Sequence, residues 1–306
     1  MEQKIIEFKN VTKKFGSKIA LDNISFTVFK GQFHGFIGAN GAGKTTSFRC
    51  LFDFYPDTKG EIFINGINST DPKSKQKIGY IPEDSTFPKK LNVRDYLNFF
   101  CELSGKTKEE SKTLVQNLMD KYEFAKELQT KNGNKLSSGE KKKVLLMQAL
   151  ISDPEILVLD EPAANLDPKI RIQLYEILKK LQKEGKTIFI SSHILAELEQ
   201  YIDSYTVIEK GKVYETKTIE EKSKSSHYNY YVTSAEIDKV EEIIKNFTLK
   251  SPFEFKKNKN TILMKLEPKQ IEKISAELFK SGLNIESIGK YKVNLNELYF
   301  DVIKGE

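Results

Sequence analysis

The sequence predicts an α/β fold with a mostly parallel sheet, followed by a smaller α+β domain. A glycine-rich loop, GANGAGKTT at 38–46, lies between an expected strand and an expected helix. Strands alternate with helices again between residues 155 and 201, a pattern typical of parallel sheets that bind ligands at the carboxyl ends of their strands. The length of 306 residues indicates about two domains.

The first domain is expected to begin with short strands at 4–8, 24–28, 33–37, 61–64 and 77–81. Residues 92–135 have helical periodicity instead, with Asn92 as a cap and with Thr107 and Glu110 at the spacing of a capping box. We therefore expect a small helical insert. Two strand–helix units follow, with strands in EILVLDEP and KTIFISSH and helices at 170–184 and 194–201.

A polar, charged run at 220–229 is typical of a linker and divides the chain into domains at 1–220 and 228–306. Beyond it, strands are expected at 230–233, 253–256, 261–266 and 284–288, and helices at 235–246 and 268–281. This β-α-β-β-α-β order is the ferredoxin-like one. A last amphipathic helix is expected in NLNELYFDVI.

Composition restricts the class of function. No apolar run approaches the roughly 18 residues that a membrane helix needs, and the start MEQKIIEFKN lacks the apolar block of a signal peptide. We therefore expect a cytosolic chain, for which any membrane role needs a separate partner. The net charge of +6 comes mainly from lysine, so no nucleic acid is expected as a partner. Cys50 and Cys101 are expected to be reduced thiols.

Residues 38–46 match the phosphate-binding pattern GxxxxGK[ST] in full. Phosphate oxygens must approach backbone N–H groups closely, which explains the glycines, and the helix that begins near Lys44 adds its N-terminal dipole. We expect Lys44 to reach the β- and γ-phosphates and the Thr45 hydroxyl to bind Mg²⁺. The expected nucleotide-binding residues of this loop are Gly38, Asn40, Gly41, Gly43, Lys44, Thr45 and Thr46.

An acidic pair completes this phosphate site. Four apolar residues, ILVL, form an expected buried strand directly before Asp160 and Glu161. Asp160 can hold Mg²⁺ together with Thr45, and Glu161 can orient the attacking water or take its proton. The pair therefore predicts hydrolysis of the bound nucleotide.

A second helix start that attracts anions lies in LSSGE at 136–140. Either Ser137 or Ser138 is placed as the N-cap, and the free N–H groups of such a helix start favour a negative ligand.

Over about residues 1–220 the chain resembles the nucleotide-binding subunit of ATP-binding cassette (ABC) transporters. Several motifs stand in the family's order: the loop at 38–46, LSSGE in place of the LSGGQ signature, LVLDEP at 157–162, ANLDP at 164–168, and ISSHIL around His193. The resemblance implies a P-loop NTPase fold of the ABC cassette type, with a mixed sheet and a helical subdomain at about 88–152. It also implies ATP and Mg²⁺ as cofactors.

The resemblance also assigns roles to single residues. Phe15 would stack on adenine, and His193 would contact the γ-phosphate and hold Glu161 and water in line. Glu83, in GYIPED, stands where the family usually has a glutamine that binds Mg²⁺. A glutamate can still bind the ion, but it adds a negative charge beside Asp160.

In this family two subunits lie head to tail, and the signature of one closes over ATP held by the other. Ser137, Ser138 and Gly139 would therefore serve the ATP of another subunit, and Asp167 would contact that subunit. Ser138 replaces a glycine and Glu140 a glutamine of the family pattern. We expect phosphate contact to survive, because serine is small and donates a hydrogen bond.

The resemblance thus implies an ATP-hydrolysing transporter motor, as a homodimer or with a paired nucleotide-binding subunit. It would lie at the cytoplasmic face of the membrane, bound to a separate transmembrane permease. The C-terminal domain resembles the accessory domain of bacterial drug, peptide or antibiotic exporter ATPases, which favours export. The alternative is a soluble ABC-type ATPase that acts in translation or another non-transport process, although those proteins generally carry two cassettes in one chain.

Overall fold

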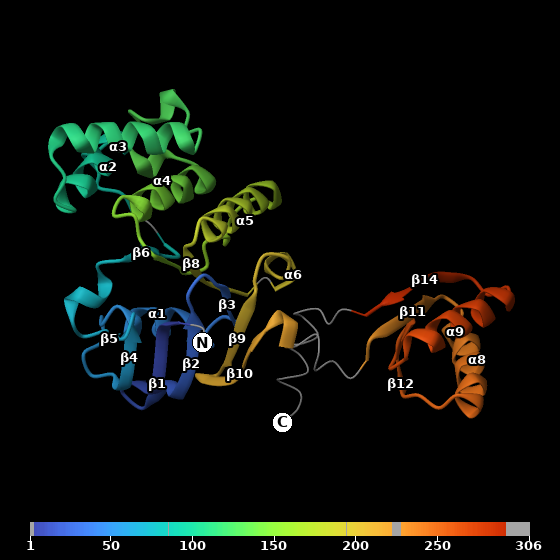
Figure 1. Ribbon diagram of the computed structural model, residues 1–306. Coiled ribbons are helices and arrows are strands. Elements are labelled where there is room, and N and C mark those ends of the chain that lie inside the picture. The colour runs from blue at the N-terminus through green and yellow to red at the C-terminus, as the bar shows by residue number, and fades with distance from the viewer. Residues whose placement is uncertain (1–2, 85, 194, 222–227, 292–306) are drawn as a thin grey trace. The chain divides into compact units, whose positions relative to one another are not determined.

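The computed structural model describes residues 3–84, 86–193, 195–221 and 228–291, which form two compact units (Figure 1). One unit lies within residues 3–219 and the other within residues 220–291. Among these described residues, no helix combines the length and the apolar character that crossing a membrane would take. The helix expected in NLNELYFDVI lies outside the described residues.

A long hairpin opens the first unit and forms most of an antiparallel sheet in the order β2-β1-β4-β5. Its two strands are longer than predicted, because Asn10 and Asn23 take positive φ angles of 51° and 52° and bulges let the pairing continue past them. The strands are β1 (Lys4–Phe15), β2 (Lys18–Phe29), β4 (Lys59–Ile64) and β5 (Ile67–Asn68), and a 3₁₀ turn, η1 (Pro72–Lys75), follows.

The second sheet of this unit is mixed, as predicted, in the order β10-β9-β3-β8-β7-β6. Its strands pair in parallel except β10, which runs antiparallel to β9. The β9–β10 hairpin was not predicted. The strands are β3 (Phe33–Ile37), β6 (Ile78–Ile81), β7 (Ile156–Leu159), β8 (Thr187–Ser192), β9 (Ser204–Glu209) and β10 (Lys212–Thr218).

Helices that follow the parallel strands pack on this sheet: α1 (Lys44–Leu51), α5 (Pro168–Lys183) and α6 (Leu195–Leu198). Phe48 of α1 lies with its ring centroid 5.9 Å from that of Phe36 in β3 and 4.9 Å from that of Phe189 in β8. All three rings are buried. These contacts fix α1, and with it Lys44, against the ends of the strands.

The helical subdomain expected at about 88–152 consists of α2 (Val93–Leu103), α3 (Lys108–Lys121) and α4 (Ser138–Leu150), with 3₁₀ turns η2 (Lys126–Leu128) and η3 (Gly133–Lys135) before α4. Asn92 caps α2, since its side chain accepts a hydrogen bond from Asp95 N. Thr107 and Glu110 form the expected capping box at the start of α3.

The second unit has the predicted β-α-β-β-α-β order, and its antiparallel sheet runs β12-β13-β11-β14. Both helices bury one face against the sheet, where Val232, Ile262, Ile244 and Leu278 form part of a separate core. The elements are β11 (Tyr230–Ser234), α8 (Ile237–Lys250), β12 (Phe255–Asn258), β13 (Thr261–Met264), α9 (Pro268–Lys280) and β14 (Ile285–Lys290).

A buried histidine joins two strands of the mixed sheet. His34 of β3 has no exposed surface, and its Nδ1 and Nε2 lie 2.8 Å and 2.9 Å from the hydroxyl oxygens of Ser204 and Thr206 in β9. Burial lowers the pKa of His34 from its ordinary 6.5 to about 3. The neutral ring therefore holds β3 beside β9 at physiological pH.

This histidine should make the fold sensitive to acid. Between pH 6.5 and about 3 the unfolded chain binds a proton on His34 that the folded chain does not, so stability falls as the pH is lowered through this window. This difference predicts a loss of about 2 kcal/mol between pH 7 and pH 5. Urea unfolding at the two pH values should show that His34→Gln lacks this part of the loss. An unchanged pH dependence in the variant would contradict this assignment.

Candidate nucleotide site

A cavity of about 810 Å³ lies at the carboxyl ends of the parallel strands and gathers most of the predicted site residues. The hairpin of β1 and β2, the loop before α1 and the loops after β6, β7 and β8 all contribute to its wall. The predicted residues that line it are Phe15, Asn40, Gly41, Gly43, Lys44, Thr45, Thr46, Glu83, Glu161 and His193.

The glycines of the loop before α1 are required by its backbone. A Cβ on Gly38 would lie 2.2 Å from the carbonyl oxygen of Ile208, and one on Gly43 would lie 2.9 Å from a methyl of Leu21. Gly41 and Gly43 also take φ angles of 82° and 117°, which side chains disfavour. The loop therefore presents backbone to the cavity, as phosphate binding requires.

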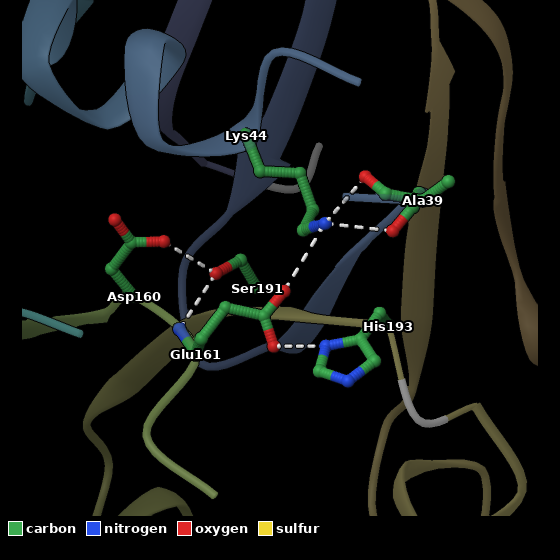
Figure 2. A network of polar contacts seen from close by, with 7 residues as sticks. Ala39, Lys44, Asp160, Glu161, Ser191 and His193 are labelled. Carbon is green, nitrogen blue, oxygen red and sulfur yellow. Dashed lines mark hydrogen bonds and ion pairs between the residues drawn. The ribbon is translucent and has the colours of Figure 1, made fainter. Parts of the chain in front are cut away.

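Lys44 and Glu161 form a buried ion pair at the centre of the site (Figure 2). Lys44 Nζ lies 3.1 Å from Glu161 Oε1, and both side chains are less than a tenth exposed. The same ammonium donates hydrogen bonds to the carbonyl oxygens of Gly38, at 2.7 Å, and Ala39, at 3.0 Å. A phosphate that enters the cavity would compete with Glu161 for this lysine.

Glu161 is held from several sides. Its other carboxylate oxygen, Oε2, lies 2.8 Å from Nδ1 of His193. Its backbone N–H donates to the hydroxyl of Ser191 at 2.8 Å, and its φ angle of 43° is unusual for a residue with a side chain. The strained backbone aims the carboxylate at Lys44 and His193 (Figure 2).

Asp160 is almost completely buried, and its two oxygens differ. Oδ1 accepts a hydrogen bond from Ser191 Oγ at 2.8 Å, whereas Oδ2 accepts none from the residues that the structure describes. Burial raises the pKa of Asp160, while the hydroxyls of Ser191 and Thr45 lower it in part. An unpartnered buried carboxylate oxygen is suited to a cation or to water bound to one.

Glu83 adds a further negative charge to this corner. Burial raises the pKa of Glu83, the nearby Asp160, Asp84 and Glu161 raise it further, and Lys142 opposes them. No cluster of three or more acidic, histidine or cysteine side chains that could hold a metal occurs within the described ranges. The donor set of carboxylates and the Thr45 hydroxyl instead suits Mg²⁺, which commonly takes one or two carboxylates, water and phosphate oxygens as ligands.

Phe15 stands at the end of β1, 43% exposed, where a planar base could stack on it. Two neighbours that sequence reasoning missed hold its ring. The buried ammonium of Lys13 lies 4.8 Å from the ring centroid, and Tyr55 makes an edge contact at 5.1 Å. Lys13 is also paired with Asp57.

The remaining predicted residues do not line this cavity; among them are Gly38 and Asp160, which precede lining residues of their own loops. Ser137, Ser138, Gly139 and Asp167 line a second cavity of about 340 Å³. Ser137 is the N-cap of α4: its hydroxyl accepts from Glu140 N at 3.3 Å, and its N–H donates to Glu140 Oε2 at 2.7 Å. Asp167 stands at the N-cap of α5, but its side chain makes no capping hydrogen bond.

Lys142 was also missed by the sequence analysis, because a lysine within EKKK reads as a solvated residue. It is buried, and its ammonium donates to the carbonyl oxygens of Pro82 at 3.0 Å and Glu83 at 2.6 Å. Helix α4, whose first turn lines the second cavity, is thereby tied to the loop that brings Glu83 to the first.

Comparison with known proteins agrees with this geometry. A family model described as ABC transporter matches residues 21–164. An uncharacterized ABC transporter ATP-binding protein of Bacillus subtilis is 31% identical, over 98% of this chain and 97% of that protein. The Nod factor export ATP-binding protein I of Burkholderia lata is 36% identical over 68% of each chain. A putative ABC transporter ATP-binding protein of Mycoplasma pneumoniae is 46% identical, and the match covers 68% of this chain but 65% of that protein.

Solved structures that resemble this chain are also ATP-binding subunits or cassettes of ABC transporters. An ATP-binding subunit of an ABC transporter superposes with a TM-score of 0.63 at 27% identity, over 71% of this chain and 91% of that one. A dimeric ATP-binding cassette in a post-hydrolysis state, bound to ADP and Pi, superposes with a TM-score of 0.64 at 24% identity, over 70% and 98%, which supports the fold alone. Fold, site geometry and relatives together show that the chain belongs to the ATP-binding proteins of ABC transporters, whose cassettes are ATPases.

Proposed function

We propose that this chain is the ATP-hydrolysing subunit of an ABC exporter, which works as a pair with a second nucleotide-binding subunit and drives a separate transmembrane permease. The observation that carries the proposal is the division of the site between two cavities. The loop before α1, Glu161 and His193 line one cavity, whereas the start of α4 and Asp167 line another. A second subunit, placed head to tail, would join the two kinds of surface.

In the first cavity, the backbone of residues 38–46 would cradle the phosphates of ATP, and the ring of Phe15 would stack on the base. Lys44 would turn from Glu161 to the phosphate oxygens, so the carboxylate loses its counter-charge when the triphosphate arrives. The buried lysine always keeps an anionic partner in this exchange.

Mg²⁺ fits the side of the cavity that Thr45 and Glu83 line. Asp160 directly precedes Glu161 of the cavity wall, and its Oδ2 is buried without a hydrogen bond from the described residues. A bound Mg²⁺ would supply positive charge against the phosphate oxygens. Glu161, released from Lys44, would orient the attacking water and accept its proton. His193, in contact with Glu161 Oε2, would hold this carboxylate in line and contact the γ-phosphate.

The lid, meaning the residues that close over the bound ATP, would come from the other subunit. Ser137, Ser138 and Gly139, at the start of α4, would offer a hydroxyl and N–H groups to the γ-phosphate of its ATP. Asp167 makes no cap in its own chain and would contact the second subunit. Loss of the γ-phosphate would weaken this interface and shift the pair toward its open state.

We also propose that the transporter is an exporter and that the chain divides into domains at 1–220 and 228–306. The similarity to a protein named for Nod factor export supports export. The match to the Bacillus subtilis protein covers 98% of this chain and so extends over the second unit, which supports an accessory domain beside the cassette. The permease would hold the subunit at the cytoplasmic face of the membrane.

Mixed dimers test the shared site directly. Lys44→Ala damages the phosphate loop and Ser137→Arg blocks the lid, so neither variant should hydrolyse ATP alone. Mixed one to one, half of the dimers contain both variants, and each of these has one intact composite site. We expect recovery of up to about one quarter of the wild-type rate if the sites act independently. No recovery, when differently tagged subunits co-purify, would contradict a site shared between chains.

A second prediction concerns Glu140, whose carboxylate stands at the helix start that the γ-phosphate would approach. Glu140→Gln keeps the capping box and removes the like charge. We expect ATP-driven dimerisation to tighten roughly two- to fivefold, the size of a charge effect at a helix terminus. Sedimentation in a Glu161→Gln background, where ATP persists, would measure it.

Glu110→Gln is the matched control for this experiment, because Glu110 holds the same position in the capping box of α3 and lines neither cavity. Equal effects of the two substitutions would mean that Glu140 acts through helix stability and not through the phosphate.

A further inference from the structure

One neutral side chain joins both acids of the site. Ser191 of β8 is fully buried, and its hydroxyl donates to Asp160 Oδ1 and accepts from the N–H of Glu161, each at 2.8 Å (Figure 2). The strand register accounts for this position. Leu159 of β7 pairs with Ile190 of β8, so the next residues along the two strands, Asp160 and Ser191, lie side by side.

The first bond decides how Asp160 presents its carboxylate. With Oδ1 held by Ser191, the direction of Oδ2 is set, and this is the oxygen that accepts no hydrogen bond within the described part of the chain. A carboxylate with neither oxygen held would turn more freely about its last torsion. Residues that orient a metal ligand in this way commonly change metal affinity when they are replaced.

The second bond decides where Glu161 points. A φ angle of 43° is costly for a residue with a side chain, and it persists only where the surroundings hold it. The hydroxyl of Ser191 satisfies the N–H of this strained residue in the interior. Without that acceptor, the buried N–H would lose its partner, and the backbone that aims Glu161 at Lys44 and His193 would be free to relax.

We propose that Ser191 is a positioning residue: its one hydroxyl sets Asp160 toward the metal ion and Glu161 toward the attacking water, so that both acids keep a fixed mutual geometry. This inference rests on the proposed function for the identity of the nucleotide and the ion. Ser191 itself touches neither of them.

The test compares Ser191→Ala and Ser191→Thr in the full-length chain. Calorimetric titration with ADP, with and without Mg²⁺, gives the factor by which the ion raises ADP affinity. Loss of a group that orients a metal ligand typically costs about 10- to 100-fold, so Ser191→Ala should lower this factor and the turnover number each at least about tenfold. ADP affinity without the ion should stay within about twofold, because the phosphate loop is untouched. Ser191→Thr keeps the hydroxyl and should restore both.

Ser234 offers a matched control in the other unit. It is equally buried, and its hydroxyl donates to the carbonyl oxygen of Asn284 at 2.7 Å and accepts from Glu236 N at 3.0 Å. Ser234→Ala should lower thermal stability without changing the Mg²⁺ factor. If Ser191→Ala does not fold, Ser191→Val set against Ser191→Thr compares side chains of the same shape with and without the hydroxyl.

An unchanged Mg²⁺ factor in Ser191→Ala would overturn the proposal, and so would an equal loss of ADP affinity with and without the ion. Failure of the wild-type chain to bind ADP would instead contradict the proposed function.

Discussion

The nucleotide cavity depends above all on the buried contact between the ammonium of Lys44 and the carboxylate of Glu161. Each charge would be costly inside the protein without the other. A phosphate could replace Glu161 as the partner of Lys44, and the exchange would leave the carboxylate available beside His193. Under the proposed function, nucleotide binding and the release of Glu161 to orient water would be one event, because charge must stay balanced in a confined space.

The surrounding fold keeps these charges in place. The aromatic rings of Phe36, Phe48 and Phe189 fix α1 on the mixed sheet. Behind them, the neutral ring of His34 joins β3 to β9. The close approach of Gly38 to the carbonyl of Ile208 fixes the phosphate loop against the end of β9. The loop is thus supported by rigid strands on one side and by a helix on the other, which suits a site that must hold three phosphates in one orientation.

Much of the candidate site and of the order of elements could be predicted from the sequence. The glycines, Lys44, Thr45 and the acidic pair could be proposed as site residues because phosphate and Mg²⁺ leave few alternatives at that spacing. The structure places Gly41, Gly43, Lys44, Thr45 and Glu161 around one cavity. Hydrophobic periodicity likewise predicted the β-α-β-β-α-β order of the second unit. The β9–β10 hairpin was overlooked although Lys210 and Gly211, both at positive φ, mark its turn.

Other features could not be read from the chain, because they depend on tertiary contacts. Ser191 matters through the register of β7 and β8, and Lys142 through the burial of one face of α4. Phe15 was expected as the adenine platform, but nothing local linked it to Tyr55, forty residues further along. The strands of the first hairpin were predicted too short, since pairing resumed beyond residues that alone look like turns.

The attachment of Lys142 to the backbone of Pro82 and Glu83 has a mechanical consequence. Because Lys142 lies near the start of α4, these hydrogen bonds attach that end of the helix to the Glu83 loop. Any tilt of α4 relative to the sheet must drag the Glu83 loop along with it, or else break two hydrogen bonds of a buried cation. Within one chain, a force that tilted α4 would therefore also displace Glu83, which lines the first cavity.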